Sequence, residues 1–162
     1  MVALLGAGLV LGGVAWTAEK PKEKPGGESQ DSIAMDRLPA AVRKTALNQI
    51  KGGVVRSISS EVEDGKKVYE FETTVQGRTK DMIIAGDGTL MLVEDRVALD
   101  ALPAPVRASI TRQVGRGTIV ALESVTRRST LAYYEAQVRT GGRRSEIKVD
   151  PSGRLILDPR KP

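Results

Sequence analysis

The sequence predicts an α+β fold of two tandem repeats, each a helix followed by a four-stranded antiparallel meander, with the helices on one face of the sheet. Three observations support this prediction. The segment Leu38-Pro-Ala-Ala-Val-Arg43 recurs as Leu102-Pro-Ala-Pro-Val-Arg107. Helical periodicity follows each copy of this segment. Strand-like alternation, broken by turn residues, follows each predicted helix.

The repeat extends well beyond the shared segment. Tyr69-Glu70 corresponds to Tyr134-Glu135, and Gly88 corresponds to Gly153; relative to the first copy, the second has one inserted residue, in the turn before the Tyr-Glu pair. Such a match in one order indicates a tandem duplication of one supersecondary unit. A unit of about 60 residues buries too little surface to be stable alone. We therefore expect the two units to share one core or one continuous sheet.

The N-terminal part of the chain predicts export. Residues 1–18 are predicted as a signal peptide or N-terminal anchor, because the stretch up to Trp16 is apolar, uncharged and shorter than the roughly 20 residues of a membrane span. It lacks the usual basic start. Residues 19–35 are charged and contain two prolines and a Gly-Gly pair, which predicts a disordered linker. We expect a periplasmic or secreted bacterial protein, anchored in a membrane if the first segment is retained.

Repeat 1 is expected at 36–93 and repeat 2 at 94–158, with a short tail at 159–162. The first helix is expected at 36–51, because apolar residues recur every fourth position and a proline stands near its start. The second copy repeats this design. The apolar positions are Val42, Ala46 and Ile50 in the first helix and Val106, Ile110 and Val114 in the second.

Eight strands are predicted from alternation and from the turns between them. They are expected at 54–62, 67–75, 79–85, 89–93, 119–126, 132–140, 144–149 and 154–157. Turns are expected at Asp64-Gly65, Gln76-Gly77, Asp87-Gly88, Arg128-Ser129, Gly141-Gly142 and Ser152-Gly153. Alternation places Tyr69, Phe71, Tyr134 and Ala136 on the side that packs on the helices. The other side is expected to be solvated.

Composition excludes several classes of site. The chain has no cysteine and no histidine, so disulfides, thiol nucleophiles, common zinc sites and a Ser-His-Asp triad are absent. The net charge of +5 is a mild excess without a dense basic stripe or stacking aromatics, which argues against nucleic-acid binding. No Gly-rich phosphate loop leads from a strand into a helix. We expect no cofactor.

The repeated pattern resembles the PepSY-like domains, which are grouped with the β-lactamase-inhibitor-like fold. The resemblance rests on Leu-Pro-x-x-Val at the helix start, Tyr-Glu in a strand, a glycine turn and a final Gly-x-Leu, and it covers 36–158 in both copies. It implies a helix-plus-meander unit and an exported bacterial protein. It also implies binding or inhibition, for example restraint of a secreted peptidase, and not catalysis.

The candidate binding residues lie on the predicted solvated side of the sheet. They are Tyr133, Glu135, Arg139, Arg144, Lys148, Glu70 and Glu72. Tyr133 is the candidate anchor, since an exposed tyrosine is a frequent centre of protein interfaces. Tyr69 and Tyr134 are interpreted as packing residues. Basic residues outnumber acidic ones more strongly in the second repeat, which suits an acidic partner surface or simply solubility.

Glu70, Glu72 and Asp81 allow two other readings. Paired carboxylates on one strand face can serve acid–base catalysis, but no nucleophile or pocket accompanies them. Calcium binding lacks the usual Asp-rich loop. The favoured hypothesis is therefore a non-enzymatic, exported binding protein with a protein partner. The alternative is an accessory or sensory domain that binds a small ligand, a metal or an envelope polymer between the repeats.

Overall fold

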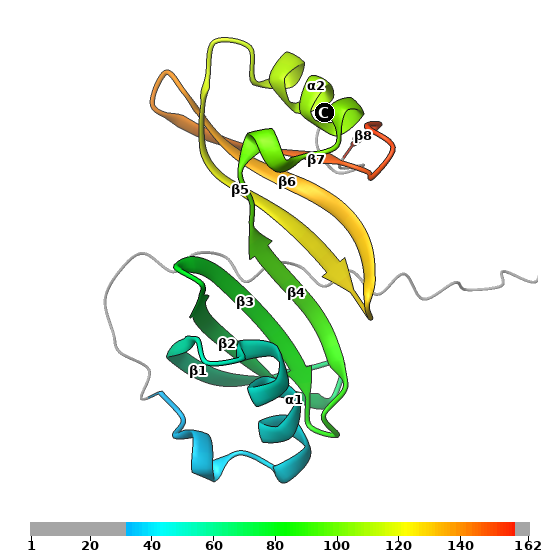
Figure 1. The fold of residues 1–162 in the computed structure, drawn as a ribbon. Helices are drawn as coiled ribbons and strands as arrows, with labels where there is room; N and C mark the ends of the chain where they lie inside the picture. Colours follow the sequence, from blue (N-terminus) through cyan, green and yellow to red (C-terminus); the bar gives the residue numbers. More distant parts are fainter. Residues whose placement is uncertain (1–31, 158–162) are drawn as a thin grey trace, which may run out of the picture.

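The computed structural model describes residues 32–157, and it shows an α+β fold with two helices and one open antiparallel sheet of eight strands (Figure 1). The helices are α1 (Ala40–Ile50) and α2 (Ala104–Val114), each preceded by a short 3-10 turn, η1 (Met35–Arg37) and η2 (Leu99–Ala101). The strands are β1 (Val54–Glu63), β2 (Lys66–Val75), β3 (Arg78–Ala85), β4 (Leu90–Arg96), β5 (Thr118–Arg127), β6 (Thr130–Thr140), β7 (Arg143–Val149) and β8 (Leu155–Ile156). The order of a 3-10 turn, a helix and four strands thus occurs twice.

The first helix begins later than the sequence predicts. Pro39 is extended, with ψ of 142°, and Asp36 lies in the separate turn η1, so α1 starts at Ala40 and not at Asp36. Pro103 is extended in the same way before α2. A proline ring disfavours the helical conformation of the residue before it, and Leu38 and Leu102 are both extended, which separates each 3-10 turn from the helix that follows.

The sheet is continuous across both halves of the chain. Its strand order is the sequence order from β1 to β8, and β4 pairs with β5, with Arg96 opposite Glu123. The expectation of one continuous sheet is confirmed. The predicted strands agree with the observed ones to within about two residues, apart from β4, which was expected to end at Val93 and continues to Arg96 to make this pairing.

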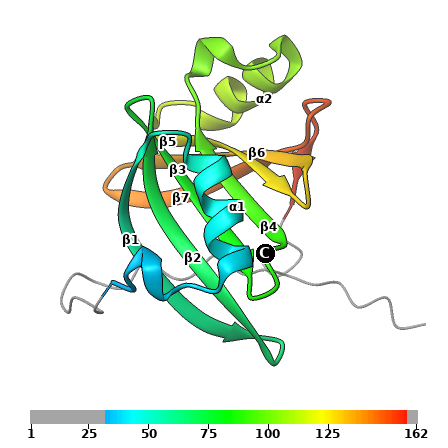
Figure 2. The ribbon, with the colours of Figure 1, turned by 60° about the horizontal axis from the view of Figure 1, so that its bottom comes forward.

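Both helices pack on the same side of the sheet, which we call the helix face. Figure 2 shows α1 lying across the strands of the first half. It contacts β2 and β3, and α2 contacts β6 and β7. The first cluster of buried residues includes Val42, Phe71 and Ile84, and the second includes Val106 and Tyr134. Cross-strand neighbours share a face, and the register carries this side continuously from β2 to β7.

The turn between β3 and β4 is tied to α1. The Thr45 hydroxyl donates a hydrogen bond of 2.8 Å to the carbonyl oxygen of Gly88. Residues 32–35, at the end of the expected linker, also contact this half of the molecule. The Ile33 N–H donates to the carbonyl of Ile58 at 2.8 Å, and Ile33 and Met35 pack on the first cluster. The predicted signal segment and most of the predicted linker lie outside the described residues.

Within residues 32–157, neither helix is long and apolar enough to span a lipid bilayer.

Candidate functional site

The candidate site lies on the side of the sheet opposite the helices, which we call the helix-free face. Two rows of cross-strand neighbours define it. One row runs Glu72, Asp81, Glu94, Val125 and Tyr133 from β2 to β6. The other row runs Arg96, Glu123, Glu135 and Lys148 from β4 to β7. Residues from both halves of the chain therefore meet on one surface.

An apolar patch occupies the middle of the helix-free face. It consists of the buried residues Val68, Ile83, Leu92 and Val125, with Met91 and Tyr133 partly buried against them. The expectation that this whole face is solvated is therefore wrong. Ile83 and Leu92 are directly paired, and large aliphatic side chains on neighbouring strands shield each other from water. The patch is the only buried cluster in residues 32–157 that joins strands of both halves on this face.

Tyr133 stands at the edge of this patch between two cations. The Arg127 guanidinium carbon lies 5.7 Å from the centre of the Tyr133 ring, and the Lys148 ammonium lies 5.4 Å from it. A cation over an aromatic face is held by the ring quadrupole. The sequence predicts an exposed Tyr133, but this residue is half-buried, because it packs against the patch.

Glu135 is buried and not exposed, contrary to expectation, with 2% of its surface accessible. Its carboxylate lies 3.3 Å from the Lys148 ammonium, and Lys148 also lies 3.9 Å from Glu146. Partial burial is the largest single effect and lowers the pKa of Lys148, but the charge and hydrogen bond of Glu135, together with the charges of Tyr133 and Glu146, outweigh it and raise that pKa. Glu123, also buried, lies 3.8 Å from the Arg96 guanidinium. Along this row, two buried carboxylates in the middle are therefore flanked by one cation at each end.

The first half of the helix-free face carries concentrated negative charge. Asp81 stands between Glu72 and Glu94 in register, and like charges directly opposite each other are unfavourable. Burial, followed by the charges of Glu72 and Glu123, raises the pKa of Asp81 to about 6. Its Oδ1 atom is buried without a hydrogen-bond partner. Burial and the charges of Glu61 and Glu72 also raise the pKa of Glu70.

The structure brings some predicted site residues together and separates others. Tyr133, Glu135 and Lys148 form one group, and Glu70 and Glu72 flank Asp81 in another. Arg139 and Arg144 pair with each other at the other end of β6, exposed and about 20 Å along the strand from Tyr133. They do not join the first group.

Besides the apolar patch, four charged residues of this face were missed from the sequence. They are Glu94, Glu123, Arg127 and Arg96. Alternation along β5 places Glu123 and Arg127 on the same side as Val125, so the signal was present there. Arg96 could not be found, because it lies beyond the predicted end of β4. Among residues 32–157, no group of three or more metal-ligating side chains is positioned to hold a metal ion.

Comparison with known proteins supports the fold. No protein-family model matches the chain, and no curated protein matches its sequence. Among solved structures, a BLIP-like protein from Bacteroides fragilis is 12% identical with a TM-score of 0.58, over 74% of this chain and 84% of that one. A DUF2874 family protein from Bacteroides ovatus is 17% identical with a TM-score of 0.59, over 74% and 85%.

A protein from Bacteroides eggerthii that is proposed to be periplasmic is 15% identical with a TM-score of 0.60, covering 74% of this chain and 86% of that one. At this level of identity the likeness concerns the fold. The chain shares the BLIP-like fold with these proteins.

Proposed function

We propose that this chain is an exported, non-enzymatic binding protein that uses its helix-free face to bind a protein partner of the bacterial envelope. Tandem PepSY-like repeats and a peptidase or another secreted enzyme as the target are part of this proposal. The fold shared with a BLIP-like protein supports it. The apolar N-terminal stretch and a structural neighbour proposed to be periplasmic support the location.

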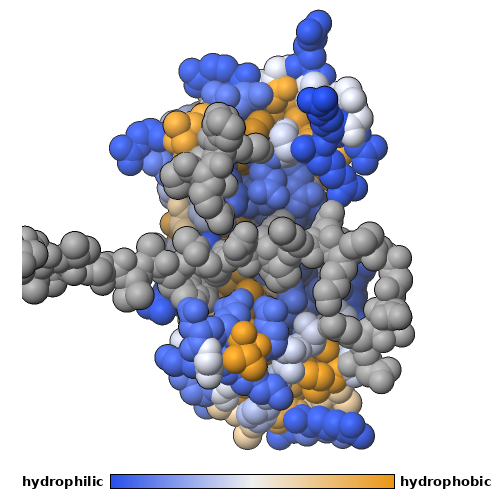
Figure 3. All heavy atoms as spheres, turned by 180° about the vertical axis from the view of Figure 1, so that it is seen from behind, coloured by the Kyte–Doolittle hydropathy of each residue, from blue (hydrophilic) through white to orange (hydrophobic). Residues whose placement is uncertain are grey.

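The position of Tyr133 carries the proposal. A half-buried tyrosine at the edge of an apolar patch, with cations 5.4 and 5.7 Å from its ring, has the composition of an interface centre. Protein interfaces have an apolar core, a polar rim, and aromatic and arginine residues at the positions that contribute most to affinity. Figure 3, seen from behind the view of Figure 1, shows a mostly hydrophilic surface with separate hydrophobic patches in both halves.

The carboxylates and cations around the patch would supply specificity. Glu70 and Glu72 lie in the acidic first half of the helix-free face, and Lys148 lies in its second half. Charged groups at the rim mainly select partners and speed association, whereas the apolar centre contributes most of the affinity. Arg139 and Arg144 belong to the proposal as outer contacts.

The test is an affinity capture from envelope and culture-supernatant proteins of the source organism with the full-length chain as bait. Tyr133→Ala is the test variant. Leu47→Ala is the matched control, because Leu47 is an exposed aliphatic residue on α1 with 56% of its surface accessible. We expect Tyr133→Ala to weaken the captured complex about tenfold or more, as at an interface centre. A complex lost with Leu47→Ala and kept with Tyr133→Ala would move the site to the helix face.

A further inference from the structure

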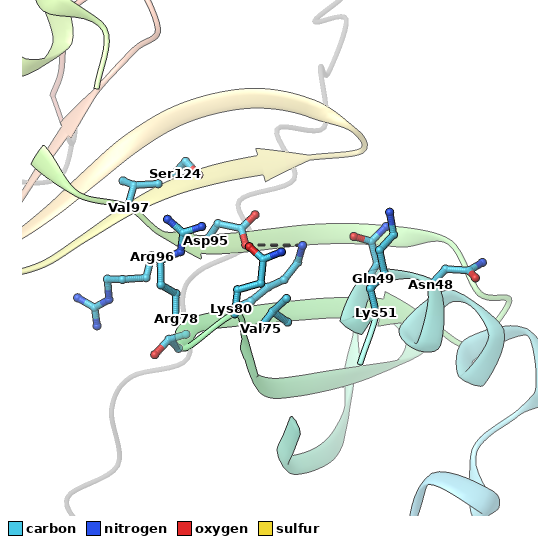
Figure 4. Close-up of a pocket in the computed structure, with 12 residues that line it drawn as sticks. Asn48, Gln49, Lys51, Val75, Arg78, Lys80, Asp95, Arg96, Val97 and Ser124 are labelled. Atoms are coloured by element: carbon cyan, nitrogen blue, oxygen red, sulfur yellow. Dashed lines mark ion pairs between the residues drawn. The ribbon is translucent and has the colours of Figure 1, made fainter. Parts of the chain in front are cut away.

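A groove of about 700 Å³ opens on the opposite side of the sheet from the proposed partner site. It lies between the end of α1 at 48–51, the β2–β3 hairpin at 75–80 and the end of β4 at 95–97, with Ser124 of β5 at its border. Figure 4 shows Gln49 and Lys51 extending from the end of the helix on one side, and Lys80 and Asp95 meeting in the middle. Its volume is within the range of pockets that hold ligands.

The groove exists because a polar seam separates the two helix-face clusters. The register on this face runs from Thr73 through Lys80, Asp95 and Ser124 to Tyr134. Its two ends, Thr73 and Tyr134, are buried. The three residues between them are polar, although they lie on the side of the sheet that carries the helices. Neither α1 nor α2 has its main contacts with β4 or β5, so this seam remains open.

Positive charge predominates in the groove. Lys51, Arg78 and Lys80 line it, and Asp95 is the only carboxylate among its lining residues. Lys80 is 3.6 Å from Asp95, with side-chain exposures of 16% and 45%. The charge of the mostly buried Lys80 side chain is therefore balanced by a carboxylate that is itself open to solvent. Arg96 also borders the groove but pairs with Glu123.

Three of the uncharged lining residues are suited to a peptide backbone. Asn48, Gln49 and Gln76 offer side-chain amides, which can donate to and accept from backbone groups. No aromatic side chain is among the lining residues, so the groove lacks the flat ring on which a sugar would stack. Lysine and arginine side chains form strong charge-assisted hydrogen bonds with carboxylates.

We infer that this groove binds an acidic peptide segment, with the side-chain carboxylates of the peptide between Lys51, Arg78 and Lys80. An incoming carboxylate shares Lys80 with Asp95, and Asp95 therefore limits the affinity of the groove. This site is distinct from the proposed partner site, since the two lie on opposite faces of the sheet. Each can be tested without the other.

The test measures binding of a fluorescein-labelled hexaglutamate peptide to the full-length chain by fluorescence anisotropy at low salt. The variant Lys51→Gln with Arg78→Gln removes two groove charges. The control Lys44→Gln with Arg112→Gln removes two exposed charges outside the groove. We expect about fivefold weaker binding for the groove variant and less than twofold for the control, as for partly exposed ion pairs. Equal weakening in both variants would overturn the inference.

Asp95→Asn supplies a second readout of opposite sign. It removes the only opposing charge, so hexaglutamate should bind more tightly, while Asp64→Asn in the exposed β1–β2 turn should have no such effect. Unchanged or weaker binding by Asp95→Asn would contradict the inference. Tighter binding of oligogalacturonate than of hexaglutamate through Lys51 and Arg78 would overturn the peptide assignment in favour of an anionic polymer. Loss of hexaglutamate binding in Tyr133→Ala would place the site on the other face.

Discussion

The Lys148 ammonium lies 3.3 Å from the carboxylate of Glu135, a residue with only 2% of its surface accessible. Lys148 is itself about one-third exposed, so the pair reaches from the interior of the helix-free face to solvent. The same lysine lies over the ring of Tyr133. This single side chain therefore links a buried charge to the proposed partner-binding residue.

Lys148→Met is expected to destabilise the protein by about 2 kcal/mol. Removing one member of a buried pair leaves an uncompensated charge, and the partial exposure of Lys148 reduces the usual cost. The double variant Lys148→Met with Glu135→Met should recover most of the loss, because the buried Glu135 carboxylate is removed together with its cationic partner. Chemical denaturation measures both. A double variant as unstable as the single one would show that the pair does not act as described.

Stability should rise as the pH falls from about 7 towards 4, because of Asp81. Its pKa is about 6 in the folded protein and 3.8 in the unfolded chain, so the folded state binds the proton more tightly across this window. The free energy of unfolding therefore increases on acidification, by about 1 kcal/mol after allowance for solvent screening. The raised pKa of Glu70 acts in the same direction.

Asp81→Asn should flatten this pH dependence, and thermal melts at a series of pH values will show it. Asp150 acts in the opposite direction at lower pH. Hydrogen bonds from Ser152 and Arg154 lower the pKa of Asp150, so its contribution to stability is lost as the pH falls below about 4. A wild-type protein whose stability falls between pH 7 and 5 would contradict the environment described for Asp81.

Gly88→Ala and Gly153→Ala should each destabilise the protein by about 2 kcal/mol or more. Both glycines have positive φ, and an added Cβ would lie 2.9 Å from the carbonyl oxygen of Ala41 or 2.8 Å from that of Pro105. Gly77→Ala is the control, because Gly77 also has positive φ but its Cβ would meet nothing within 4 Å. That variant should lose only about 1 kcal/mol. Equal losses at all three positions would mean that the contact between turn and helix is unimportant.

Deletion of residues 102–162 should leave the first half without a cooperative melt. The deletion removes the strand that pairs with β4 and takes Val125 and Tyr133 from the apolar patch. A unit of this size buries too little surface to compensate. Circular dichroism of the fragment 32–101 tests this, and a sharp thermal transition would contradict the dependence of each half on the other.

Local patterns in the sequence predicted most of the fold. Alternation and turn glycines predict the bounds of β2 and β6 to within two residues of the observed ones. They can do so because side-chain direction along a strand depends only on neighbouring positions. The end of β4 was missed, because Arg96 is in a strand only through its pairing with Glu123 in the other half. No pattern in the sequence around Arg96 indicates that pairing.

The same reasoning explains what was missed at the candidate site. Alternation correctly places Glu135 on the helix-free face, but its burial depends on Lys148 and on the neighbouring strands. The burial of Glu123 has the same origin in its cross-strand partners. Tyr133 was identified as an anchor on the assumption of exposure, whereas it is half-buried against the apolar patch.

The most direct measurement of the central claim is photo-crosslinking in intact cells of the source organism. A photo-reactive amino acid is placed at position 133 on the helix-free face or at position 47 on the exposed side of α1. We predict a protein adduct from position 133 that is absent from position 47. An adduct from position 47 alone, or no adduct from position 133, would contradict the claim that the helix-free face binds a protein partner.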